Sequence, residues 1–152
     1  MDQRAILKAL KLAGLCPPQL KDNGNLTGNT YVDTVGLAAA LFVIYTGEID
    51  AALGSTAEGT APLVEECDTT NGSYTAVTGA ALADAIADTE DLSLFAVSVD
   101  LTKTHKRYMR WQTPHSGDGT TGVNACAFVI GFPSDQMPHN AAGMGLAELI
   151  EA

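Results

Sequence analysis

SLFAVSVDL at residues 93–101 begins a series of three predicted strands that decides the fold; KRYMRWQT (106–113) and VNACAFVIGF (123–132) follow it. In the first stretch Phe95 and every second residue after it are apolar, which is the period of a strand with one buried face. The third stretch is apolar at nearly every position, which is typical of a central strand covered on both sides. Pro133 then ends it. These stretches predict a β-rich protein.

The second stretch divides its side chains less simply. Met109 and Trp111 share one side of the predicted strand, whereas Tyr108 and Arg110 lie on the other. Neither side is purely apolar, so we expect this strand to present a face to a partner. We expect Trp111 to pack in the core beside Met109; a platform for stacking a sugar or docking a peptide is the alternative interpretation.

The rest of the chain adds strands and turns. Residues 33–47 predict one buried strand, and residues 63–67 and 74–77 predict a hairpin closed by Asn71 and Gly72, a strong short-range turn signal. The glycine-rich stretch PHSGDGTTG (114–122) predicts a long exposed hairpin loop. Residues 80–91 predict a short helix or a wide loop. Short strands separated by turn signals predict an all-β or mainly-β domain, either a β-sandwich or a jelly roll.

The N-terminal region reads differently from this body. Ile6, Leu7 and Leu10 form an apolar helical stripe within residues 1–15, and Pro17 with Pro18 would end such a helix. We expect a short helix packed on its own domain, or an arm that docks on a neighbouring subunit. The predicted division is an N-terminal arm and connector (1–30), a β-sandwich body (31–138) and a C-terminal tail (139–152).

Charge is unevenly distributed along the chain. The sequence has 8 Lys and Arg against 18 Asp and Glu, a formal net charge of -10, which argues against nucleic acid as a partner. Residues 22–102 contain no Lys or Arg. The cations form two groups, near the N-terminus and in the central strands: Arg4, Lys8, Lys11 and Lys21, then Lys103, Lys106, Arg107 and Arg110. The second group could meet an acidic patch on a partner or on a second copy of the chain, or it is ordinary surface charge.

The cysteines and apolar segments bear on the compartment. Cys16, Cys67 and Cys126 form no CxxC motif and are expected to be buried free thiols. The N-terminus has no apolar core of a secretion signal. The apolar run at 35–45 is shorter than the roughly 20 residues that a helix needs to span a bilayer. We therefore expect a soluble protein, made inside the cell, with no membrane partner.

No catalytic constellation is recognisable. The sequence contains no GxSxG, GxGxxG or GxxxxGK[ST] motif. His105, His115 and His139 lack metal-ligand spacing and are interpreted as solvated loop residues. Glu65 and Glu66 are adjacent, so they point to opposite faces of a strand and are interpreted as solvated, edge-protecting charges. We expect no enzymatic activity, no cofactor and no metal site.

Four stretches of the chain share their order with a known family: DTVGLAAALFVIYTG (33–47), PLVEECDTTNGSYTAV (62–77), KRYMRWQT (106–113) and ACAFVIGFPSDQMP (125–138). Together they resemble a family of small virion proteins of tailed bacteriophages, described as head decoration, cement or minor capsid proteins. Proteins that this chain resembles carry a KRYxR strand, then a glycine-rich hairpin and an apolar strand. The resemblance covers residues 31–138.

The resemblance implies a mechanical function. The body would sit on the outside of a capsid, bind the major capsid protein and stabilise contacts between its subunits, alone or as a homo-oligomer. The protein would be made in the host cytoplasm and reside in the virion. The expected contact residues are Arg4, Lys8, Lys106, Arg107, Arg110 and Trp111. The alternatives are a tail, head-tail or spike component, or a module that binds host glycans through Trp111 and Tyr108.

Overall fold

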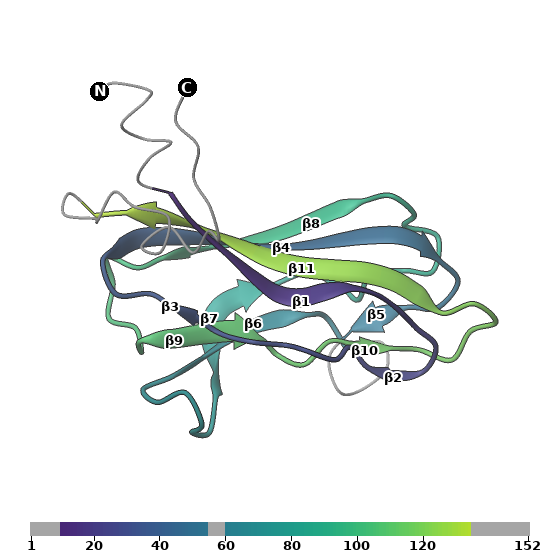
Figure 1. Ribbon diagram of the computed structural model, residues 1–152, viewed down its shortest axis with the longest axis horizontal. Helices are drawn as coiled ribbons and strands as arrows, with labels where there is room; N and C mark the ends of the chain where they lie inside the picture. Colours follow the sequence, from purple (N-terminus) through teal and green to yellow (C-terminus); the bar gives the residue numbers. More distant parts are fainter. Residues whose placement is uncertain (1–9, 55–59, 135–152) are drawn as a thin grey trace.

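A computed structural model describes residues 10–54 and 60–134, and these residues form a mainly-β fold in three antiparallel sheets (Figure 1). Sheet A has the order β1-β11-β4-β8, sheet B the order β2-β10-β5, and sheet C the order β3-β9-β6-β7. The strands are β1 (Lys11–Lys21), β2 (Gly24–Asn25), β3 (Val32–Asp33), β4 (Leu37–Ile49), β5 (Leu53–Gly54), β6 (Leu63–Cys67), β7 (Thr75–Ala81), β8 (Leu94–Asp100), β9 (Tyr108–Trp111), β10 (His115–Ser116) and β11 (Val123–Pro133). The predicted mainly-β class is confirmed, and the layers are consistent with a β-sandwich.

Sheet A is built on two long apolar strands, β4 and β11. β11 lies between β1 and β4 and pairs antiparallel with both, which confirms that it is a central strand. The register places Val129 opposite Phe42 and Ala127 opposite Ile44, and these four side chains are buried. The inner face of sheet A is therefore one wall of the core.

Sheet C supplies the opposite wall (Figure 1). β6 and β7 form the predicted antiparallel hairpin around Asn71 and Gly72. β9 runs between β3 and β6 and sends Met109 and Trp111 into the core, where neither has exposed surface. The Trp111 ring meets the Phe42 ring of sheet A edge to face, with centroids 6.1 Å apart. Trp111 thus joins the two sheets.

The prediction of a long exposed hairpin loop at residues 114–122 is wrong. β9 belongs to sheet C and β11 to sheet A, so the stretch between them crosses the sandwich. On the way it forms β10, which pairs with β2 on one side and β5 on the other, and Ser116 is fully buried. The segment has few apolar side chains, so its composition suggested an exposed loop. Pairing of its backbone with a strand on each side allows it to be covered all the same.

The predicted N-terminal helix is wrong for residues 11–15, which begin β1. Leu15 and Cys16 are buried, and β1 pairs with β11 along most of its length. β1 is an edge strand, and Pro17 and Pro18 fall at a register shift where no ladder hydrogen bond is needed from them. Residues 11–25 therefore contribute strands to sheets A and B. Residues 1–9 and the predicted tail at 139–152 lie outside the described residues.

The structure also bears on two smaller predictions, the 80–91 segment and the cysteines. Of the two alternatives for residues 80–91, the wide loop is confirmed; it follows β7, and Ile86 forms a bridge with Leu53. All three thiols are free, with Cys16 and Cys67 buried and Cys126 half-buried. Burial, together with the neighbouring Cys126, raises the pKa of Cys16 to about 11.

Across residues 10–54 and 60–134, no helix is long and apolar enough to cross a membrane.

Candidate interaction surface

The outer face of sheet C carries an aromatic and cationic cluster that follows from the alternation of β9. Because Met109 and Trp111 point into the core, Tyr108 and Arg110 point outward. Tyr31, just before β3, and Tyr74, just before β7, contact this pair. We call the set of Tyr31, Tyr74, Arg107, Tyr108 and Arg110 the Tyr–Arg surface. It holds three of the four tyrosines of the chain.

Its rings and guanidinium groups touch one another. Tyr31 and Tyr108 meet edge to face with centroids 5.3 Å apart. The guanidinium carbon of Arg107 lies 5.1 Å from the Tyr108 ring centroid, and that of Arg110 lies 4.0 Å from the Tyr74 centroid. Both distances are within the range of cation–π attraction, worth about 0.5–1 kcal/mol at exposed sites. These contacts hold large side chains in fixed positions on a rigid sheet.

Carboxylates orient both arginines from the side. Arg110 donates from Nε to Glu65 Oε1 at 2.6 Å. Arg107 donates to Asp33 through Nε and a terminal nitrogen, at 3.0 and 2.7 Å, in a bidentate pair. The hydrogen bond from Arg107 holds the pKa of Asp33 below its usual range and raises the pKa of Arg107. The two guanidinium groups are therefore held in fixed positions, and their charges are balanced by Asp33 and Glu65.

The interpretation of Glu65 and Glu66 as solvated, edge-protecting charges is wrong. β6 is an inner strand between β9 and β7, and Glu65 is only 8% exposed beneath Arg110. Glu66 accepts hydrogen bonds from the His105 ring at 3.0 Å and from the Lys106 backbone N–H at 3.1 Å. Each glutamate thus accepts a hydrogen bond from a residue that is distant in sequence, so the sequence spacing does not reveal the interaction.

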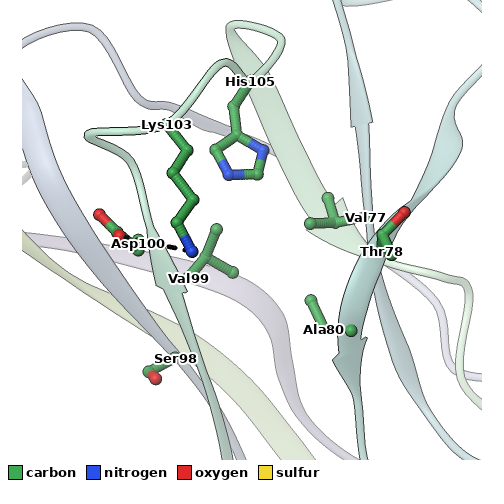
Figure 2. Close-up of a pocket in the computed structure, with 9 residues that line it drawn as sticks. Val77, Thr78, Ala80, Ser98, Val99, Asp100, Lys103 and His105 are labelled. Atoms are coloured by element: carbon green, nitrogen blue, oxygen red, sulfur yellow. Dashed lines mark ion pairs between the residues drawn. The ribbon is translucent and has the colours of Figure 1, made fainter.

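A shallow groove of about 230 Å³ opens between the edge strands β7 and β8 (Figure 2). Val77 and Ala80 approach it from β7, and Lys103 and His105 enter from the segment after β8. Lys103 faces Asp100 at 3.8 Å, and His105 is paired with Glu66. Lys103 and His105 are thus each engaged by a neighbouring carboxylate.

The expected contact residues have different fates. Arg107 and Arg110 belong to the Tyr–Arg surface, and Lys106 lies beside it with Nζ 3.0 Å from Thr75 Oγ1. Trp111 is 0% exposed, so it is a core residue, and its expected role as a surface contact is wrong. Arg4 and Lys8 lie outside the described residues.

The sequence reasoning missed Tyr31 and Tyr74 as members of this surface. Tyr74 begins the predicted strand 74–77 and Tyr31 lies just before β3, but nothing in the sequence indicates that their rings contact the side chains of β9. The histidine interpretation also needs correction. His105 is paired with Glu66, and His115 lies partly buried in β10, so neither is a solvated loop residue. His139 lies outside the described residues. Within the described part of the chain, no three His, Cys, Asp or Glu side chains converge to hold a metal ion.

Comparison with known proteins finds no matching family model, curated protein or solved structure.

Proposed function

We propose that this protein is a non-enzymatic virion component that binds the outer surface of a bacteriophage capsid and stabilises contacts between major capsid subunits. The docking face in this proposal is the Tyr–Arg surface. The observation that carries it is the gathering of three tyrosines and two arginines on one outer sheet face of an acidic protein. Tyr and Arg are the residue types that dominate binding energy at protein interfaces.

The preset geometry of this surface supports a docking role. Tyr31 is 42% exposed although its ring packs on Tyr108, so much of its area is free for a partner. Asp33 and Glu65 fix the two guanidinium groups, which lowers the entropy cost of ordering them on binding. The whole chain has a formal net charge of -10, and the Tyr–Arg surface places two guanidinium groups on an outer sheet face of this acidic protein, where they can meet an acidic partner.

The capsid as partner comes from the resemblance of residues 31–138 to phage decoration proteins, and the mainly-β body is compatible with it. A tail, head-tail or spike component would use the same surface on another virion protein. The glycan-binding alternative has less support, because Trp111, one of the two residues on which it depended, is buried.

The test mixes the purified protein with capsids that lack it and follows co-sedimentation and capsid melting. Saturable binding with a raised capsid melting temperature is expected, because a ligand of the assembled state stabilises that state by mass action. Tyr31→Ala and Tyr108→Ala should each weaken binding about tenfold or more. The control is Leu20→Ala on β1 of sheet A, which is 65% exposed and should bind as the parent does.

Absence of binding at saturating protein would refute the capsid role. Binding that all three variants retain would refute the Tyr–Arg surface as the docking face while leaving the capsid role intact.

A further inference from the structure

The chain contains two Asn–Gly pairs, Asn23–Gly24 and Asn71–Gly72, and the fold places them in different surroundings. In such a pair the backbone nitrogen of the glycine can attack the side-chain amide carbon of the asparagine, because glycine has no Cβ to shield the nitrogen or to restrict its backbone. The attack needs a glycine nitrogen without a strong hydrogen bond and an asparagine side chain that is free to turn. The surroundings of each pair therefore decide whether it reacts.

The Asn23–Gly24 pair is held by the backbone of sheet B. The Asn23 N–H donates a hydrogen bond to the Gly117 carbonyl oxygen at 3.1 Å. Gly24 belongs to β2 and pairs with the buried Ser116 of β10, whose hydroxyl donates to the Gly24 carbonyl oxygen at 3.2 Å. This pair has to leave the ladder before the Asn23 side chain can reach the Gly24 nitrogen.

The Asn71–Gly72 pair lies in the turn between β6 and β7, and both residues are exposed. The Gly72 N–H donates to the Thr69 carbonyl oxygen at 3.4 Å, which is longer than the usual range of about 2.7–3.2 Å for such bonds. Within the described part of the chain, the side-chain hydrogen bonds of this turn involve Thr69 and Tyr74 and not Asn71. The attacking nitrogen is therefore weakly held, and the Asn71 side chain is free to approach it.

The turn favours glycine at position 72 for a separate reason. A Cβ at this position would lie 2.5 Å from Cys67 Sγ and 2.5 Å from Thr69 Oγ1, closer than packed atoms approach one another. Cys67 is buried, so its thiol has little room to move away. The glycine that makes Asn71 reactive is thus also the residue that fits the turn.

We propose that Asn71 is a site of spontaneous deamidation, for which the turn itself supplies the nucleophile. The Gly72 backbone nitrogen forms a bond to Asn71 Cγ, and the amide group of the side chain leaves as ammonia with the proton that the nitrogen loses. Water then opens the resulting succinimide ring at one of its two carbonyl carbons, which gives aspartate or isoaspartate at position 71. No electrons are transferred, and water is the only co-reactant. This inference goes beyond the proposed function and does not depend on it.

The product alters the border of the Tyr–Arg surface. The Tyr74 hydroxyl lies 3.5 Å from the carbonyl oxygen of Thr70, the residue before Asn71, and the Tyr74 ring carries the Arg110 guanidinium group. Deamidation adds a negative charge to the turn, and isoaspartate also adds a carbon atom to its backbone. The modification therefore changes charge and backbone length beside a surface that presents two guanidinium groups.

Incubation of the folded full chain in mildly alkaline buffer, followed by peptide mapping, tests the proposal. Cleavage after glutamate separates the two pairs, because residues 1–48 then carry Asn23 and residues 67–90 carry Asn71. Mass spectrometry should show that Asn71 converts about tenfold or more faster than Asn23, since Asn23 reacts only after local opening of sheet B. In urea that unfolds the chain, both asparagines should convert at similar rates.

Asn71→Gln is the matched control, because glutamine keeps the amide but would have to form a larger ring. Its peptide 67–90 should stay unmodified in the folded chain under the same conditions. Equal rates at Asn23 and Asn71 in the folded protein would overturn the proposal, as would an unmodified Asn71 in the folded protein when both asparagines react in urea. Chromatography separates the two products, and aspartate without isoaspartate would refute the succinimide route.

Discussion

Replacement of Trp111 by alanine separates a core role from a contact role. Trp111 has no exposed surface and packs edge to face on Phe42. Truncation of a buried Trp costs roughly 3–5 kcal/mol. Its Nε1 has no hydrogen-bond partner within residues 10–54 and 60–134, so removal of this donor returns roughly 1 kcal/mol of desolvation penalty. The expected loss in unfolding free energy is about 2–4 kcal/mol, which a domain of typical stability of about 5–15 kcal/mol survives.

Urea unfolding measures this loss. It is followed by far-UV circular dichroism and not by tryptophan fluorescence, because the substitution removes the only tryptophan. The melting temperature should fall by about 5–15 °C. Below that temperature, capsid binding should stay within about threefold of the parent, because no side-chain atom of Trp111 reaches a partner. Tyr108→Ala should show the reverse pattern, with weakened binding and nearly unchanged stability. A loss below about 1 kcal/mol combined with abolished binding would refute the reasoning, since it would mean that Trp111 is a surface contact.

Three further substitutions test individual interactions. Arg110→Ala should destabilise the protein by roughly 1–3 kcal/mol, because it leaves the buried Glu65 carboxylate without its partner. Adding Glu65→Gln should restore part of that loss in urea unfolding. An equal loss in the double variant would contradict a stabilising Arg110–Glu65 pair. Asp33 has a depressed pKa through Arg107, so its stabilising contribution is present above the ordinary value of 3.8 and is lost as the pH falls through the lower, folded value. Asp33→Asn should therefore flatten the acid limb of the melting temperature, and an unchanged acid limb would exclude this contribution. Asp50 accepts hydrogen bonds from the backbone N–H groups of residues 120–122. Asp50→Ala should therefore speed amide hydrogen exchange in that loop and leave the amides of β11 protected. Unchanged exchange would show that other contacts hold the loop.

The strands were predictable where hydrophobic alternation or a turn signal was local. Residues 63–67 and the Asn71–Gly72 turn specified the β6–β7 hairpin, and the doubly apolar pattern of β11 specified a central strand. Both signals are contained within a few residues of chain, so no long-range information was needed to read them.

The errors arose where long-range pairing overrides local pattern. The helix was predicted from the spacing of Ile6, Leu7 and Leu10, which precede β1 in the sequence, whereas pairing with β11 makes residues 11–21 an edge strand that tolerates its two prolines. The 114–122 stretch looked exposed because its partners, β2 and β5, are short and distant in sequence. Glu65 looked solvated because Arg110 reaches it only through the β6–β9 register.

The residues of the candidate surface were likewise only partly predictable from the sequence. Alternation around Met109 and Trp111 was enough to place Tyr108 and Arg110 on one side of β9, as the structure has it. Tyr31 and Tyr74 join them through tertiary contacts alone. Which residues of β4 and β11 point to the core could not be recognised beforehand, because an apolar strand reads as buried on both sides unless its sheet neighbours are known.

Hydroxyl-radical footprinting of the four tyrosines, in the free protein and on capsids, tests the docking face most directly. The account predicts that Tyr31, Tyr74 and Tyr108 become protected on binding while the reactivity of Tyr45, on the opposite sheet, does not change. Protection of Tyr45 with unchanged reactivity at the other three would contradict it, because the protein would then bind the capsid through sheet A.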